Sequence, residues 1–144
     1  MIRQATPKDI PVILDLYNKG LIELGETNIV ESCLLRKVVN SYHLAPCFLV
    51  VKNDNIIGMA GLTVVTTSHN GVAQLCDYMF YVQPEHRNIN ILSELVENIK
   101  EFARDSDMPI KLEFITDNDQ NLRERVLKMH GFKVYSVSGV YNGI

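Results

Sequence analysis

The sequence lacks the features that mark several large classes of protein. It has no internal repeat, no linker rich in proline or serine and no block of like charges. Its net charge is −3, whereas proteins that bind nucleic acids or anionic membranes normally present a basic face, so we expect neither partner. No apolar run approaches the ~18 residues that a membrane-spanning helix needs. Residues 1–6 contain no apolar leader segment, which favours a cytoplasmic protein.

Cysteine is also scarce. The three cysteines are Cys33, Cys47 and Cys76, an odd number, and they lie among apolar residues. They form neither a Cys-x-x-Cys pair nor a cluster with histidine that has the spacing of a metal site, so we expect no metal cofactor. This pattern predicts three buried free thiols, which is typical of a reducing compartment.

The composition that remains is that of an ordinary globular domain, with 47% hydrophobic and 22% charged residues. A chain of this length buries roughly 68–70% of the surface that its unfolded form exposes, which is enough for a core without disulfides. Because no shift of composition marks a boundary, we predict one domain over residues 1–144.

The apolar pattern predicts a mixture of strands and helices. Strands are expected where β-branched and apolar residues cluster: 1–5, 48–52, 56–65, 72–82, 111–116 and, as one or two closing strands, 132–141. Helices are expected where apolar residues recur every three or four positions: from Thr6 to Gly25, over 31–42, over 90–105 and over a last segment that ends at Gly131. Thr6 as N-cap, Pro7 at the first helical position and Asp9 in the capping-box position mark the first helix start.

The order of these elements predicts an α+β fold. It is not the regular alternation of a doubly wound sheet. We expect a mixed, mostly antiparallel sheet of six to seven strands with helices on both faces. Strand 72–82, helix 90–105 and strand 111–116 should form one crossover between parallel neighbours. Ligands favour the point where such a strand feeds its helix, which here is residues 80–92.

The segment from Phe80 to Leu92 combines an apolar strand end, Pro84, a polar loop and a helix start. A loop that opens a helix presents unpaired backbone N–H groups and the positive end of the helix dipole, which suit a diphosphate. Arg87 adds a positive charge that could contact phosphate in forked geometry. The alternative is an ordinary strand–loop–helix connection with a solvated arginine.

This segment resembles motif A of the GNAT superfamily, the N-acetyltransferases that use acetyl-CoA. In that family an apolar strand ends in Val-x-Pro-Glu-x-Arg, and Val82, Pro84, Glu85 and Arg87 match the pattern in register. The opening segment 2–9 is similar to the usual start of the family, a strand followed by a capped helix. The segment 121–132 looks like motif B, a helix closed by Gly-Phe.

The sequence departs from the family at the glycine-type positions of motif A, which are Asn88, Asn90 and Leu92 here. Asparagine tolerates left-handed backbone angles better than other residues with a side chain. Leucine is bulkier than the small residue it replaces, and it stands where the diphosphate would approach. Such relaxed glycines are similar to the phage-encoded branch of the family.

The resemblance implies transfer of an acetyl group from acetyl-CoA, the co-substrate, to a primary amine of a small molecule or a protein. The strand before the loop would offer a backbone N–H to the thioester carbonyl, and the loop and helix start would hold the diphosphate. The cofactor-binding residues implied are Phe80, Tyr81, Val82, Arg87, Asn88, Ile89, Asn90, Ile91 and Leu92, with Asn121 on the pantetheine or acceptor side. GNAT folds often pair as homodimers, and the sequence leaves the oligomeric state open.

The attacking amine must be neutral, and a lysine-type amine titrates near ~10.4, so a base is needed. Asp77 is the candidate, because it lies on the strand where many members of the family place a glutamate. Strict alternation would put it on one face with Met79 and Tyr81. As the side chain is one methylene shorter than glutamate, a bridging water is expected. The alternative is an aspartate satisfied by backbone donors or by a buried arginine.

The general acid is not assigned. The family often uses a tyrosine where this sequence has Leu127, so Tyr135, Tyr141 or solvent would supply the proton, or the thiolate needs none. His86 and His130 neighbour the two motifs, and neither is expected to be catalytic. The alternatives to a transferase are a catalytically degenerate GNAT-like module for CoA binding or protein interaction, and an α+β binding protein unrelated to CoA.

Overall fold

The structure is a computed structural model that describes residues 1–113 and 120–134. Its strands are β1 (Ile2–Gln4), β2 (Cys47–Lys52), β3 (Asn55–Thr66), β4 (Ala73–Val82) and β5 (Ile110–Lys111). Its helices are α1 (Ile10–Glu23), α2 (Glu31–Tyr42), α3 (Ile89–Ser106) and α4 (Gln120–Met129), with two short 3₁₀ helices, η1 (Pro7–Asp9) and η2 (Pro84–His86).

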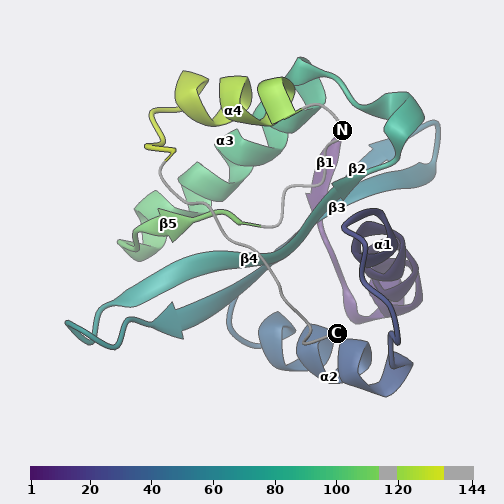
Figure 1. The fold of residues 1–144 in the computed structure, drawn as a ribbon, viewed down its shortest axis with the longest axis horizontal. Helices are drawn as coiled ribbons and strands as arrows, with labels where there is room; N and C mark the ends of the chain where they lie inside the picture. Colours follow the sequence, from purple (N-terminus) through teal and green to yellow (C-terminus); the bar gives the residue numbers. More distant parts are fainter. Residues whose placement is uncertain (114–119, 135–144) are drawn as a thin grey trace, which may run out of the picture.

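The strands form one sheet in the order β1-β2-β3-β4-β5. The three pairs β1–β2, β2–β3 and β3–β4 are antiparallel, and β5 runs parallel to β4 after the crossover through α3. Helices α1 and α2 cover one face and α3 and α4 the other (Figure 1). The α+β class, the mixed and mostly antiparallel sheet and the single parallel crossover are confirmed.

The described residues contain five strands, fewer than the six to seven expected. Within the expected strand 111–116, residues 114–116 lie outside the described part of the chain. Of the closing segment 132–141, residues 132–134 adopt no strand and the rest lies outside the described part. Among the described residues, no helix is long and apolar enough to cross a membrane.

The start of the first helix follows the capping signal. The Asp9 carboxylate accepts the backbone N–H of Thr6 at 2.8 Å, and the first turn is a 3₁₀ turn with Pro7 at its start. Arg3 donates two further hydrogen bonds to the same carboxylate, at 2.8 and 2.9 Å. This contact ties β1 to the entry of α1, and it lowers the pKa of Asp9 well below its usual range.

A bulge in the pairing of β3 with β4 changes which side chains share a face. Met79 lies opposite Gly61 and Asp77 lies opposite Leu62, so Tyr78 is an extra residue on β4. Tyr78 and Met79 therefore pack in the same core cluster, against α1 and α2. The expectation of strict alternation, with Asp77 on the face of Met79, is wrong because the bulge interrupts it.

The prediction of three buried thiols is wrong in part. Cys47 is buried under α1 and α2, whereas Cys33 is exposed on α2 and Cys76 is partly exposed on β4. Of the two leucines that follow Cys33, Leu34 points into the core and Leu35 is exposed, so the apolar neighbours in sequence do not indicate whether Cys33 is buried.

Candidate active site

The candidate site begins where β4 ends and α3 starts. The chain leaves the strand at Val82, and the backbone N–H of Gln83 still donates to Ile57 on β3 at 2.8 Å. The loop then makes the short helix η2 and reaches Asn88, the N-cap of α3. The predicted strand, loop and helix start are therefore present in this order, and the loop is anchored at both ends.

The first turn of α3 presents free backbone donors. The Asn88 side chain accepts the N–H of Ile91 at 3.0 Å, which satisfies one of the helix's initial N–H groups. Within the described residues, the N–H groups of Ile89 and Asn90 have no hydrogen-bond partner. Together with the positive end of the dipole of an 18-residue helix, they form a suitable anion site.

The glycine replacements do not strain this turn. Asn88 has φ −154°, which is extended backbone, and Asn90 lies in the helix without a positive φ. The left-handed tolerance that the sequence suggested for asparagine is therefore not used. Leu92 is 1% exposed and packs in the core under α3, so its side chain points away from the loop surface rather than toward a bound diphosphate.

The guanidinium of Arg87 is buried, with 6% of its side chain exposed. Its Nε donates to the carbonyl of Val82 at 2.7 Å, and its Nη2 donates to both carboxylate oxygens of Glu23 at 2.8 and 2.7 Å. It also lies 5.4 Å from the centre of the Tyr81 ring. The charge is thus paired with a carboxylate on α1, and the expected forked contact of this side chain with phosphate stays a prediction.

Asp77 is 3% exposed and lies where the described pairing of β4 with β5 ends. Its Oδ1 accepts the backbone N–H of Glu113 at 2.7 Å. This contact provides the backbone donor of the structural alternative, and it also places the carboxylate beside the chain that continues β5.

The strand end that should polarise the thioester is fully packed. Phe80, Tyr81 and Val82 are buried and pair with β3. The residues expected to diverge from them on the other side belong to 114–116, outside the described residues, so the expected opening between β4 and the continuation of β5 stays a prediction. Burial raises the pKa of the Tyr81 phenol, so this side chain is a neutral hydroxyl at physiological pH.

Motif B places Asn121 on the exposed first turn of α4. Leu127, which stands where the family often has a tyrosine, is buried in the core beneath α3 and α4. Tyr135 and Tyr141, the alternative proton donors, lie outside the described residues.

Two groups of contacts in this region, one around His130 and one between Glu23 and Arg87, join residues that the sequence analysis did not connect. The Ser93 hydroxyl lies 2.6 Å from Nε2 of His130, and Glu97 lies 3.4 Å from Nδ1 of the same ring. These contacts connect the end of α4 to α3. The other contact is that of Glu23 with Arg87, across 64 positions of sequence. No local signal could have found either pairing, because each partner is an ordinary polar residue on a helix or loop.

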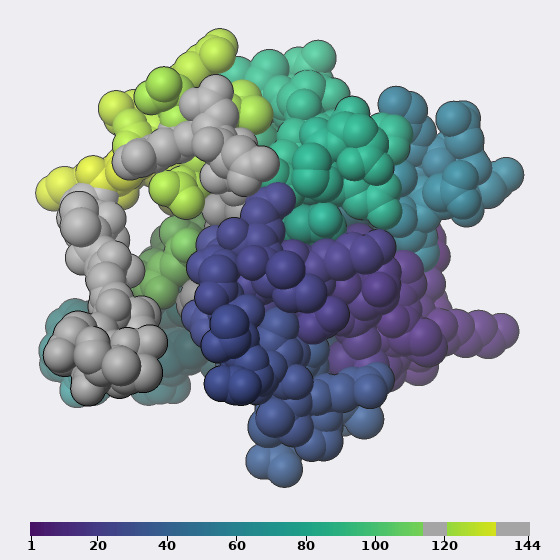
Figure 2. Space-filling model, turned by 45° about the vertical axis from the view of Figure 1, so that its right-hand side comes forward, coloured from purple at the N-terminus to yellow at the C-terminus, as the bar shows by residue number. Residues whose placement is uncertain are grey.

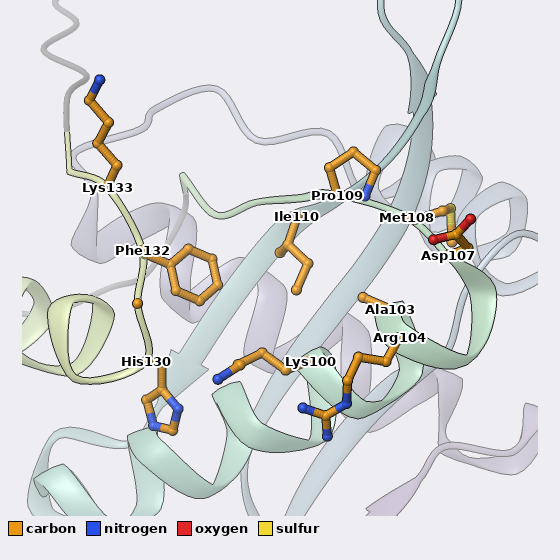
Figure 3. A pocket seen from close by; sticks show the side chains of 11 residues that line it. Lys100, Ala103, Arg104, Asp107, Met108, Pro109, Ile110, His130, Phe132 and Lys133 are labelled. Carbon is orange, nitrogen blue, oxygen red and sulfur yellow. The ribbon is translucent and has the colours of Figure 1, made fainter.

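A cavity of about 570 Å³ lies elsewhere, at the C-terminal end of α3. Figure 3 shows Ile110 and Phe132 facing one another across it, with Lys100 and His130 at its edge. An 18-residue helix is ~27 Å long, so this cavity is far from the N–H groups at the start of α3. The cavity therefore does not coincide with the predicted diphosphate site.

Several solved structures similar to this chain are described as acetyltransferases. A structure described as a predicted acetyltransferase with acetyl-CoA from Clostridium acetobutylicum is 22% identical, with a TM-score of 0.78 over 99% of this chain and 95% of the other. Aminoglycoside 6′-N-acetyltransferase AAC(6′)-Ig from Acinetobacter haemolyticus is 16% identical, with a TM-score of 0.71 over 100% and 98% of the two chains.

A third structure, AAC(6′)-Iy in complex with a CoA-containing bisubstrate analogue, is 15% identical, with a TM-score of 0.72 over 100% of this chain and 97% of the other. At these identities the likeness shows the fold. No curated protein matches the sequence. The model of the acetyltransferase (GNAT) family, however, matches residues 15–132, which is most of the chain. The chain therefore belongs to the acetyltransferase (GNAT) family.

Proposed function

We propose that this protein transfers the acetyl group of acetyl-CoA to a primary amine by direct attack within a ternary complex. The observation that carries the proposal is the pair of unpartnered N–H groups, on Ile89 and Asn90, at the start of α3 in a chain of this family. They suit the diphosphate of acetyl-CoA, with Asn88, Ile91 and Leu92 shaping the turn that presents them.

In the proposed reaction the amine nitrogen attacks the thioester carbon, the carbon–sulfur bond breaks, and an amide and CoA result. A backbone N–H of the Phe80–Val82 segment polarises the carbonyl oxygen as negative charge develops on it. The proton lost by the amine passes through a water to Asp77, whose Oδ1 also holds the N–H of Glu113. The departing thiolate takes a proton from solvent, since a thiolate is a tolerable leaving group.

The acceptor that we propose is a small polar amine, and a protein amine is the alternative. Three structural neighbours are named as aminoglycoside acetyltransferases, which supports the first. Residues 20–45 would form the acceptor side, and Asn121 would contact the pantetheine or the acceptor. Exposed Glu26 and Glu31 suit a cationic amine, whereas Glu23 is engaged by Arg87. A single domain over 1–144, a homodimer, the cytoplasmic location and the phage-encoded branch stay predictions.

The proposal is tested by calorimetric titration with acetyl-CoA, followed by detection of free thiol on incubation with a panel of amines. Binding together with amine-dependent thiol release is expected. Absence of acetyl-CoA binding would overturn the proposal. Binding without thiol release for any amine would favour the second candidate, a degenerate CoA-binding module, which the lost glycines and the buried Leu127 support.

Asp77 offers a matched pair of variants. Asp77→Asn keeps an oxygen that can accept the Glu113 N–H and replaces the other carboxylate oxygen by an uncharged amide NH2 group, whereas Asp77→Ala removes both oxygens. If Asp77 is the base, Asp77→Asn should lower kcat by about 10²–10⁴-fold, with the affinity for acetyl-CoA nearly unchanged. If its role is structural, Asp77→Asn should retain activity, and only Asp77→Ala should lose activity and stability.

A further inference from the structure

We infer that the ion pair of Glu23 with Arg87 positions the loop before α3, and that the loop binds the diphosphate of acetyl-CoA without direct contact from the Arg87 side chain. Both are positioning residues in this assignment, one on the acceptor-side helix α1 and one in the loop. The inference rests on the proposed function, because it concerns how the proposed co-substrate is held.

The contacts of Arg87 account for most of its hydrogen-bonding capacity. One edge of the guanidinium donates to Val82 through Nε, and Nη2 donates to both oxygens of Glu23, all within 2.8 Å. The two side chains are 6% and 18% exposed. Figure 2 shows the regions that carry them, α1 in dark blue and the start of α3 in teal, meeting on one face of the molecule.

These contacts fix the loop at the residue that precedes the helix cap. The backbone N–H groups of His86 and Arg87 bond to carbonyls within the loop, at 2.9 and 3.3 Å. The Arg87 side chain then folds back to the carbonyl of Val82, which closes the loop on the end of β4. Because Asn88 follows directly, the position of Arg87 sets the direction in which the N–H groups of the first turn point.

The N–H groups of Nη1 donate no hydrogen bond within the described residues, but only 6% of the side chain is exposed, so Arg87 would have to move away from Glu23 to reach a phosphate at the surface of the loop. That movement would strand a largely buried carboxylate without its partner, which is strongly unfavourable. The pair is also neutral as a whole, so it adds no net charge to attract an anion. Recognition by uncharged N–H groups differs measurably from recognition by a cation, because removing a cation that contacts phosphate reduces the salt dependence of binding.

The experiment compares acetyl-CoA binding by the wild type, Glu23→Gln, Arg87→Gln and the double variant, at two salt concentrations and well below the melting temperature. Each single variant should raise Kd about tenfold, and the double variant no further, because the two residues act as a unit. The salt dependence of Kd should be the same in Arg87→Gln as in the wild type. With an accepted amine, KM for acetyl-CoA should rise while kcat is unchanged.

The matched control is Asp15→Asn, which removes an exposed ion pair with Lys19 on the same helix. It should leave Kd unchanged. Arg87→Lys should recover part of the lost affinity, because an ammonium group can pair with Glu23 without also reaching Val82. If Arg87→Gln does not fold, the Kd values of Glu23→Gln and Arg87→Lys for acetyl-CoA test the same ion pair.

Two results would overturn this inference and leave the proposed function standing. One is a Kd for acetyl-CoA in Glu23→Gln equal to that of the wild type. The other is a smaller salt dependence of Kd in Arg87→Gln than in the wild type, which marks a direct phosphate contact. Failure of the wild type to bind acetyl-CoA would instead overturn the proposed function, and this inference with it.

Discussion

The two faces of the sheet are packed with different side chains. Under α3 and α4 the core is aliphatic apart from one phenylalanine of β2 and one of β4, and it includes the fully buried Leu95 and Ile99. Under α1 and α2 it contains tyrosine, cysteine and methionine, with the rings of Tyr17 and Tyr78 5.1 Å apart. The first face is an apolar surface on which α3, the helix with the free N–H groups, packs. The second face buries polar side chains as well as apolar ones.

The polar groups of the second face are held in their neutral forms. Burial raises the pKa of the Cys47 thiol to about 12, and it also raises the pKa of the Tyr78 phenol. Neither group is therefore a nucleophile at physiological pH. Both faces therefore bury apolar side chains, and the α1–α2 face adds neutral polar groups and aromatic contacts to them.

The largest expected effect tests the aliphatic face. Leu95→Ala truncates a fully buried side chain of α3 that packs against the sheet, and it leaves a cavity. We expect the free energy of unfolding to fall by about 2–5 kcal/mol, measured by urea denaturation. Leu35→Ala on α2 is the control, because that leucine is exposed and should change stability little. Equal effects of the two changes would contradict the assignment of this core.

A smaller effect is expected where the bulge brings the Tyr78 ring over Gly61. A methyl group at Gly61 would overlap the ring, which is buried and rigid, so Gly61→Ala should cost about 1–3 kcal/mol. Gly20→Ala on α1 meets only the flexible end of Met79 and gains helix propensity, so it should cost less. Denaturation of both variants checks the order, and a greater loss in Gly20→Ala would refute it.

The smallest effect concerns pH at the entry to the α1–α2 face. The hydrogen bonds from Arg3 lower the pKa of Asp9 in the folded protein below the ordinary value of about 3.9. The stabilisation is therefore complete above that value and is lost as the pH falls through the lower folded value. Asp9→Asn should lower stability by about 1–2 kcal/mol at neutral pH and should weaken the loss of stability in acid. Stability curves from pH 7 to pH 2 measure this, and parallel curves for both proteins would contradict it.

Local signals in the sequence predicted much of the fold. The capping residues at Thr6–Asp9, the turn at 53–55 and the periodicity of 90–105 each involve neighbours a few positions apart, and such patterns report directly on backbone geometry. The segment 80–92 was identified for the same reason: its apolar strand end, proline and polar loop follow one another along the chain.

Contacts between distant residues could not be predicted in this way. The sequence suggested that Arg87 faces phosphate, but its partner Glu23 stands on another helix. The alternation argument failed on β4, because a bulge depends on how two strands register and not on either strand alone. Asp77 was found as an isolated carboxylate in an apolar strand, yet its contact with Glu113 depends on the parallel neighbour.

The amino-acid sequence by itself determined where most of the described helices and strands begin, which segment opens a helix after a strand, and the family. Only the tertiary structure decided which charges are available for binding. The folded chain pairs Arg87 with a carboxylate on α1, turns Leu92 into the core and leaves two backbone N–H groups at the head of α3. The reason is physical: the availability of a polar group depends on what packs against it, and packing joins residues that sequence order separates.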